Sequence, residues 1–138
     1  MARVAKFTPE DARWRKIRGA EIYVGDIIGS ELSPSMGVGY TRHGAGEAND
    51  WTVSYDEVFV CLKGEYSIET ADGEKVSARA GEVLWLQANT PITYGGAADE
   101  DTVVVYITYP TWLDTTKTNE LSEDYFEEPG GPVVVDLG

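Results

Sequence analysis

The chain has 138 residues, 42% of them hydrophobic, and its formal net charge at pH 7 is −13. One domain of this length can bury a core without disulfides or structural metals, and the composition is typical of a globular protein. A chain this acidic repels phosphate backbones and anionic lipid surfaces. We therefore expect neither nucleic acid nor a membrane as a partner.

Cys61 is the only cysteine and lies in an apolar run. It cannot form an internal disulfide, and we interpret it as a small core residue rather than a nucleophile. The opening sequence MARVAKFTPEDARWRK lacks the apolar centre of a secretion signal. No apolar run approaches the roughly 18 residues that a membrane-spanning helix needs. We therefore expect a cytoplasmic protein.

An N-terminal segment, residues 1–21, has a mixed pattern in which Thr8 and Pro9 are typical of the start of a short helix. Short apolar or alternating segments follow, and Asp72 and Gly73 give a strong hairpin signal. The predicted strands cover residues 22–28, 36–42, 56–62, 65–70, 75–80, 81–87, 89–96 and 102–109. This spacing, with no long helical pattern, indicates an all-β sandwich or barrel over residues 22–112.

Residues 113–138 are predicted to form an acidic C-terminal arm. Acidic side chains dominate its first part, whereas residues 133–135 are three consecutive valines. This apolar run argues against complete disorder. A short strand here could pair with a sheet edge of the same subunit or of a neighbouring one.

Two segments resemble the paired motifs of the cupins. Glu57 to Gly64 matches the Glu-x6-Gly end of the first motif, and GEVLWLQANTPI at 81–92 matches the second, G-x5-P-x-G-x2-H, in spacing and leading glycine. The proline, second glycine and histidine of the second motif are replaced by Gln87, Asn89 and Ile92. The two motifs, joined by the hairpin, imply a cupin jelly-roll β-barrel.

A closer resemblance, over about residues 36–112, is to the cupins of the ethanolamine-utilisation Q (EutQ) type. It rests on WTVSYDE at 51–57, AGEVLWL at 80–86 and VVYITYPTW at 104–112. Members of this family tend to lack the metal-binding histidines, and an acetate kinase-like activity has been attributed to some of them. The resemblance therefore implies an EutQ-like cupin, with that activity as one expectation.

The usual histidine metal site is missing from the sequence. Its places before Glu57 are filled, depending on the motif spacing, by Asp50 and Thr52 or by Trp51 and Val53. A transition metal in a cupin needs about three or four converging imidazole or carboxylate ligands. Only Asp50, Glu57 and His43 are weak candidates, so no tightly bound metal is expected. Mg²⁺, held by Glu57 and Asp50, is the cofactor that a kinase would require.

His43 is the sole histidine and lies in the sequence GYTRHGAGE. It could be a ligand or a general base, because its pKa is ordinarily near neutrality. The flanking Gly44 and Gly46 favour a solvated loop histidine instead. Arg42 beside it could bind a carboxylate or phosphate through two hydrogen bonds, although an arginine at a strand end is more often solvated.

Glu57 is the strongest candidate for a functional residue. Strand alternation puts Tyr55, Phe59 and Cys61 on its face, which the cupin resemblance directs into the barrel. A carboxylate buried there must be paired, hydrogen-bonded or protonated. We predict that Glu57 and Tyr55 are catalytic or anchoring residues. The predicted ligand-binding residues around them are Tyr40, Arg42, Trp51, Trp85, Tyr94 and Tyr106.

Three functions fit these features. The first is an EutQ-like cupin that binds a small polar metabolite without a tight metal, either with or without acetate kinase-like activity. The second is a metal-dependent cupin lyase, isomerase or oxygenase that uses His43, Glu57 and a tyrosine. The third is a non-catalytic assembly or regulatory module. The absence of a phosphate-binding glycine loop counts against an ordinary kinase. Because cupins commonly pair through sheet faces and edge strands, we expect a homodimer.

Overall fold

The computed structural model describes residues 3–110 and 125–137, and these residues are almost entirely in β-strands and turns. The strands are β1 (Arg13–Ile17), β2 (Ile22–Ile28), β3 (Gly37–His43), β4 (Ala48–Thr52), β5 (Asp56–Lys63), β6 (Glu65–Thr70), β7 (Lys75–Arg79), β8 (Val83–Leu86), β9 (Pro91–Gly95), β10 (Thr102–Tyr109) and β11 (Phe126–Glu127). None of the described residues belongs to a helix with the length and apolarity that a membrane crossing requires.

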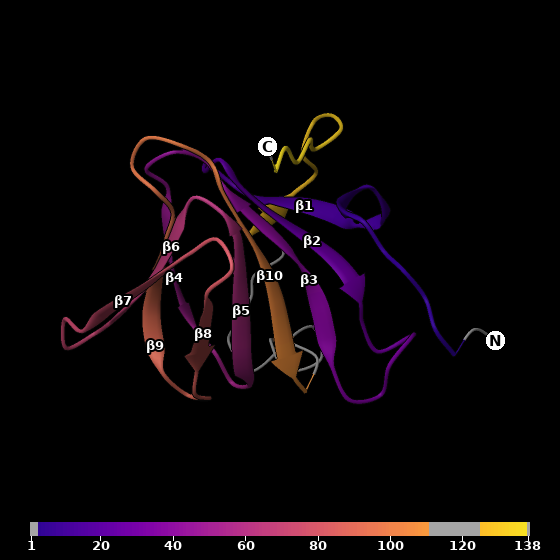
Figure 1. Cartoon of the computed structure of the whole chain (residues 1–138), viewed down its shortest axis with the longest axis horizontal. Helices are drawn as coiled ribbons and strands as arrows, with labels where there is room; N and C mark the ends of the chain where they lie inside the picture. Colours follow the sequence, from indigo (N-terminus) through magenta and orange to yellow (C-terminus); the bar gives the residue numbers. More distant parts are fainter. Residues whose placement is uncertain (1–2, 111–124, 138) are drawn as a thin grey trace.

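The strands form two antiparallel sheets that pack face to face (Figure 1). The larger sheet has the order β11-β1-β2-β3-β10-β5-β8, and the smaller has the order β4-β9-β6-β7. Neighbours in these orders are often far apart in the chain, which is typical of a jelly roll. The prediction of an all-β jelly roll is confirmed, although the two sheets form an open sandwich rather than a closed barrel.

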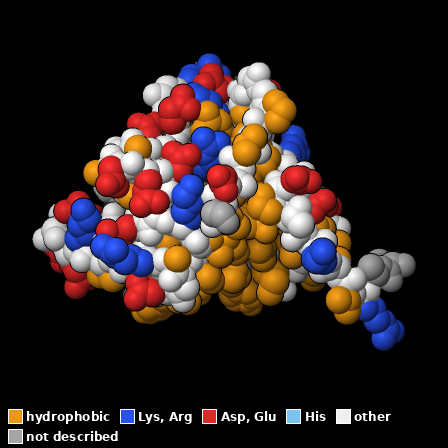
Figure 2. Space-filling view, turned by 45° about the horizontal axis from the view of Figure 1, so that its top comes forward, with side chains coloured by type: hydrophobic (Ala, Val, Ile, Leu, Met, Phe, Trp, Pro, Cys, Tyr) orange, Lys and Arg blue, Asp and Glu red, His pale blue; other side chains and the backbone are white. Residues whose placement is uncertain are grey.

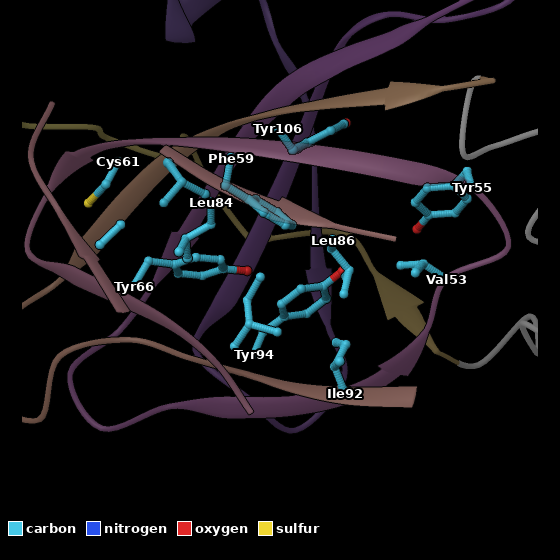
Figure 3. Packing of buried hydrophobic residues seen from close by; sticks show 13 residues of the cluster. Val53, Tyr55, Phe59, Cys61, Tyr66, Leu84, Leu86, Ile92, Tyr94 and Tyr106 are labelled. Atoms are coloured by element: carbon cyan, nitrogen blue, oxygen red, sulfur yellow. The ribbon is translucent and has the colours of Figure 1, made fainter. Parts of the chain in front are cut away.

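The core lies between the two sheets. The larger sheet contributes Phe59, Leu84 and Tyr106 to it, and the smaller contributes Tyr66 and Tyr94. In Figure 3, Cys61 lies at one end of this cluster, and Val53 and Tyr55 lie at the other. The interpretation of Cys61 as a core residue is confirmed by its burial.

Three strands were not predicted from the sequence. β1 lies where a short helix was expected; a 3-10 turn, Pro9–Asp11, does begin after the cap Thr8, but it ends before Arg13. β4 has the polar sequence ANDWT and no alternation of apolar residues. β11 pairs with β1 inside the acidic arm, whereas residues 133–135 are not in a strand. Pairing with neighbours, rather than local pattern, makes these segments extended.

The glycine pattern of the cupin motifs has a direct structural cause. Gly64 ends the first motif with a φ of +78°, and a Cβ there would lie 2.4 Å from the hydroxyl oxygen of Thr102. Asn89 replaces the second glycine of the second motif and has a φ of +68°. Asparagine tolerates this left-handed conformation better than most residues. The substitution therefore preserves the turn that the motif needs.

The outer face of the larger sheet is apolar. Two cross-strand rows of side chains on β3, β10, β5 and β8 form it, and we call them the outer apolar face. The rows are Tyr40, Val105, Val60 and Val83, followed by Val38, Ile107, Val58 and Trp85. Figure 2 shows hydrophobic side chains gathered in the lower middle of the molecule, where these strands run. Trp85 is 65% exposed.

Candidate functional site

A cavity of about 60 Å³ lies between the two sheets. Aromatic side chains make up much of its lining, together with a few polar groups. The polar groups include Glu57 from β5, His43 from β3 and Asn49 from β4. A small, mostly apolar cavity with a few convergent polar groups is typical of a small-molecule site.

Glu57 is the only carboxylate that lines the cavity among the described residues. It is 6% exposed, and strand alternation on β5 turns it inward together with Phe59. The hydroxyl of Tyr94 on β9 donates a hydrogen bond to Glu57 Oε1 over 2.6 Å. Burial raises the pKa of Glu57 to about 8, although this hydrogen bond opposes the rise. The side chain is therefore mostly a neutral acid at pH 7, able to donate as well as accept a hydrogen bond.

Three aromatic rings pack together next to Glu57. Tyr66 and Tyr94 stack with their ring centroids 5.8 Å apart, and Phe59 lies 5.1 Å from Tyr66 and 5.4 Å from Tyr94. Figure 3 shows the hydroxyls of Tyr66 and Tyr94 directed into the space between the sheets. Burial raises the pKa of both hydroxyls well above the usual value of 10. They stay protonated and can donate hydrogen bonds.

Tyr55 closes one end of the same space. Its hydroxyl accepts a hydrogen bond from Trp51 Nε1 over 2.9 Å, which ties the end of β4 to the start of β5. Burial is the main cause that raises the pKa of Tyr55, and the nearby Glu57 raises it further. Both predicted residues, Trp51 and Tyr55, therefore line the cavity with Glu57.

His43 also lines the cavity, so the expectation of a solvated loop histidine is wrong. It is the last residue of β3 and is 1% exposed. Its Nε2 lies 3.0 Å from Asn49 Oδ1, and within the described part of the chain its Nδ1 is buried without a hydrogen-bond partner. Burial lowers the pKa of His43 to about 4. The neutral ring therefore donates from Nε2 to Asn49 and leaves Nδ1 as a lone pair.

Tyr106, a predicted ligand-binding residue, lines the cavity, but its hydroxyl is engaged elsewhere. Its hydroxyl donates instead to Asp26 on β2, and Asp26 is paired with Arg15 on β1. The ring crosses Gly39 of β3, where a Cβ would lie 2.4 Å from the Tyr106 hydroxyl. A glycine is therefore needed at this position to let Tyr106 reach Asp26.

Four of the predicted site residues lie elsewhere. Tyr40 and Trp85 belong to the outer apolar face, because each alternates with an inward-facing neighbour on its strand. Arg42 also points outward, where it pairs with Asp101 and donates to the backbone oxygen of Val134. Asp50 is exposed on β4 and accepts a hydrogen bond from Thr93. None of these four lines the cavity.

The residues present do not fit a cupin metal. Ile92, at the histidine place of the second motif, is a buried member of the apolar core. No three His, Cys, Asp or Glu side chains within residues 3–110 and 125–137 come together as a metal site would require. Asp50 and Glu57 are on different faces, so the pair does not fit Mg²⁺ either.

Sequence reasoning missed several residues of the cavity. Tyr66, on the inner face of β6, lines the cavity but was not among the predicted site residues. Asn49 gives no signal, because its strand lacks a pattern. Tyr125 and Phe126 come from the acidic arm: Tyr125 lies 5.3 Å from Trp51, and the strand containing Phe126 pairs with β1. Trp112, the last residue of the EutQ-like segment VVYITYPTW, lies outside the described residues.

Comparison with known proteins now assigns the family. Residues 15–114 match the family described as ethanolamine utilisation protein EutQ. The chain belongs to the EutQ family. The match begins within β1 and includes every strand of the cavity except β11, so the site described above is built mainly from the family's own region.

Individual relatives of this EutQ-family chain support the same assignment. The chain is 32% identical over 89 residues to a protein named acetate kinase EutQ from Clostridioides difficile (strain 630). This match covers 64% of the chain and 54% of the relative, so the chain spans about half the length of the curated relative it matches. A solved structure of Clostridium difficile EutQ is 28% identical with a TM-score of 0.61, and 77% of this chain aligns with 81% of that one.

A more distant structure supports the fold alone. A cupin superfamily protein from Desulfitobacterium hafniense DCB-2 is 18% identical, with a TM-score of 0.56. The alignment covers 65% of this chain and 78% of that chain. The predicted cupin fold and the predicted EutQ resemblance are therefore both confirmed.

Proposed function

We propose that this EutQ-family cupin binds a small polar metabolite in the cavity between its sheets, with Glu57 as the polar anchor. The observation that carries the proposal is the hydrogen bond from Tyr94 to Glu57 inside an aromatic cavity. Burying an ionisable side chain costs free energy, and proteins usually accept this cost where the group has a function. Structural stability alone would be served better by an apolar residue at position 57.

Catalysis in this cavity would use the same residue. A carboxyl group with a pKa of about 8 can give up or take a proton near neutral pH, which is what general acid–base catalysis requires. The hydroxyl of Tyr55, on the same inner surface, would orient the ligand. In this proposal Glu57 contacts the reacting group, and the tyrosines position it.

The proposal is tested by unfolding the chain thermally with a panel of neutral, acidic and basic compounds of up to about four non-hydrogen atoms. A ligand that binds only the folded chain raises the unfolding midpoint, and the rise grows with the logarithm of the ligand concentration above its dissociation constant. We expect at least one compound to do so, and Glu57→Gln to abolish the effect. The matched control Glu69→Gln changes an exposed acid and should keep it. A panel without any stabilising compound would contradict the proposal.

Acetate kinase-like activity is a second candidate, because a relative carries that name. Phosphoryl transfer needs cationic groups around the phosphates, and no lysine or arginine lines the cavity among the described residues. A nucleotide is far too large for a cavity of about 60 Å³, so it would have to bind at the surface. A coupled assay with ATP, Mg²⁺ and acetate tests this activity. Turnover by the unmodified chain that Glu57→Gln abolishes would support this activity. Turnover no higher than that of the assay without protein would reject it.

The remaining alternatives are a metal-dependent enzyme and a non-catalytic module. His43 and Glu57 line the same cavity but lack a third metal ligand among the described residues. Less than about a tenth of an equivalent of metal in the purified protein would reject the first alternative. If no compound stabilises the chain and no assay detects turnover, the non-catalytic module is favoured. A cytoplasmic location and the absence of nucleic-acid and membrane partners stay predictions.

We also propose that two copies of the chain associate through the outer apolar face. The two rows of side chains on this face carry no charge, whereas the whole protein has a net charge of −13. Two copies can therefore meet at this face with little electrostatic repulsion. A two-fold interface uses the same surface on both subunits, as these rows allow. Light scattering should give a dimer mass, and Trp85→Glu should reduce it to a monomer. Val76→Glu, exposed on the smaller sheet, is the control.

A further inference from the structure

The cavity has an unbalanced set of charged groups. Glu57 is its one acidic residue, and no basic residue balances it among the described lining. Behind Tyr106, the carboxylate of Asp26 is already paired with Arg15. Within the described chain, an ionised Glu57 would therefore lack a counter-ion, and burial keeps it neutral instead.

The arrangement of the remaining groups suits a cation. Tyr94 occupies Glu57 Oε1, and the structure records no hydrogen bond to Oε2 among the described residues. The hydroxyl of Tyr66 likewise has no recorded partner there, and its oxygen can accept a hydrogen bond. The rings of Phe59, Tyr66 and Tyr94 pack together beside Glu57, and aromatic rings attract cations.

We propose that the cavity binds a small protonated amine, whose ammonium group pairs with the Glu57 carboxylate and packs against the aromatic rings. This inference rests on the proposed function, because it names the ligand class of the same site. The cavity of about 60 Å³ limits the size of the ligand. A cavity of about 150 Å³ holds benzene, so this one suits about two to four non-hydrogen atoms. Methylammonium and ethylammonium are ligands of this size.

The other ligand classes fit less well. A carboxylate or phosphate would place a second negative charge beside Glu57, with no arginine or lysine in the described lining to offset it. It could bind only while Glu57 is protonated. A neutral alcohol could accept a hydrogen bond from the protonated acid, but it would gain nothing from the aromatic faces beyond apolar contact. Ligand charge therefore decides which form of Glu57 is bound.

This coupling gives each ligand class its own pH dependence. An amine binds the ionised form of Glu57, so its affinity rises with pH until the pKa of about 8 and then levels off. A ligand that accepts a hydrogen bond from the protonated form loses affinity above that pH. Alkylamines stay protonated to about pH 10, as the lysine side chain does.

The other titratable groups around Glu57 do not change charge in this range. Burial raises the pKa values of Tyr55, Tyr66, Tyr94 and Tyr125. Burial lowers the pKa of His43 to about 4. All five are neutral between pH 6 and 9, so a pH dependence there reports Glu57.

The test is an NMR titration of the full chain with ethylammonium, ethanol and acetate, at constant ionic strength and in amine-free buffer. Amide shifts around Phe59 and Tyr66 report binding at the cavity. We expect ethylammonium to bind, with an affinity that rises on the order of tenfold from pH 6 to pH 7 and little above pH 8. Ethanol and acetate should bind at least tenfold more weakly at pH 8.

Two variants and the pH series make the outcome decisive. Glu57→Gln keeps the shape and removes the charge, so we expect it to weaken ethylammonium binding at least tenfold, whereas Glu69→Gln should not. The pH series on the unmodified chain does not depend on whether a variant folds. Cavity binding of ethanol or acetate without ethylammonium would overturn the amine inference but keep the proposed function. Binding of none of the three, together with an inactive thermal panel, would overturn both.

Discussion

The inner and outer faces of the larger sheet are built from the same strands, and each departs in its own way from the usual arrangement of side chains: a buried acid lies within the inner apolar core, and apolar rows lie on the outer surface. On β5, Glu57 points into the cavity, whereas Val58 and Val60 point outward. On β10, Tyr106 reaches inward to a carboxylate, whereas Val105 and Ile107 belong to the outer apolar face. The usual arrangement places apolar residues inside and polar residues outside.

These two departures show where to look for function. A buried polar group and an exposed apolar patch are the two departures from the usual arrangement that call for an explanation. Here they lie back to back on the same strands, one residue apart. For the inner departure we proposed a small ligand, and for the outer one a second copy of the chain.

Aromatic truncation on the two faces should give the largest difference. Tyr66→Ala removes a fully buried ring from the inner side, so we expect it to lower the free energy of unfolding by about 3–5 kcal/mol. Trp85→Ala removes a ring that is 65% exposed and should cost less than about 1 kcal/mol in the monomer. Chemical denaturation at low protein concentration measures both. Similar costs would break the distinction between the faces.

The fold was largely predictable because most strands carry their own signal. Residues 22–28, 65–70 and 102–109 alternate or run apolar, and each is a strand with those bounds. The inward position of Glu57 was expected from the cupin resemblance, and alternation put Phe59 and Cys61 on the same face. β4 and β11 were not predictable, because β4 is polar and β11 has only two residues; they are extended only through pairing with β9 and β1.

The errors in the site have one physical origin. Tyr40 and Trp85 were placed in the cavity because aromatic residues are common in binding sites, although their strand positions put them outside. The glycines that follow His43 predict a loop, whereas β3 extends through it. Residue type or close neighbours suggested each role, whereas the extent of the strand and the side on which the residue lies decided it.

The second prediction concerns the pH dependence of stability. Between its unfolded pKa of 4.5 and its folded pKa of about 8, Glu57 is protonated only in the folded chain, so the free energy of unfolding falls as pH rises. His43 has the opposite effect between about 4 and 6.5, because its folded pKa is lowered. The two effects offset each other below pH 6.5. A net fall on the order of 2 kcal/mol should remain between about pH 6.5 and 8.

Glu57→Gln should remove this fall and keep the rise caused by His43 at lower pH. Glu69→Gln changes an exposed acid of the smaller sheet and should leave the whole profile unchanged. Urea unfolding at half-unit pH intervals measures all three profiles. An identical fall in Glu57→Gln would show that the inner acid is not its cause.

Removing a single tyrosine hydroxyl should have a smaller effect, which differs between a buried and an exposed tyrosine. Tyr94→Phe removes the hydrogen bond to Glu57, so we expect a cost of about 1 kcal/mol at pH 6 and a further rise in the pKa of Glu57. Tyr109→Phe, on an exposed tyrosine of β10, should change neither the stability nor the pKa. Denaturation and carboxyl titration check the two expectations. An unchanged Glu57 pKa in Tyr94→Phe would contradict the assigned hydrogen bond.

The central claim is that Glu57 is a neutral acid held inside an aromatic cavity until a ligand ionises it. Its most direct test is an NMR titration of the side-chain carboxyl carbons of ¹³C-labelled glutamate, with the Glu57 signal assigned through Glu57→Gln. The account predicts a titration midpoint near pH 8 in the free protein. A midpoint near the ordinary 4.5 would contradict it, because Glu57 would then be an ionised and solvated side chain.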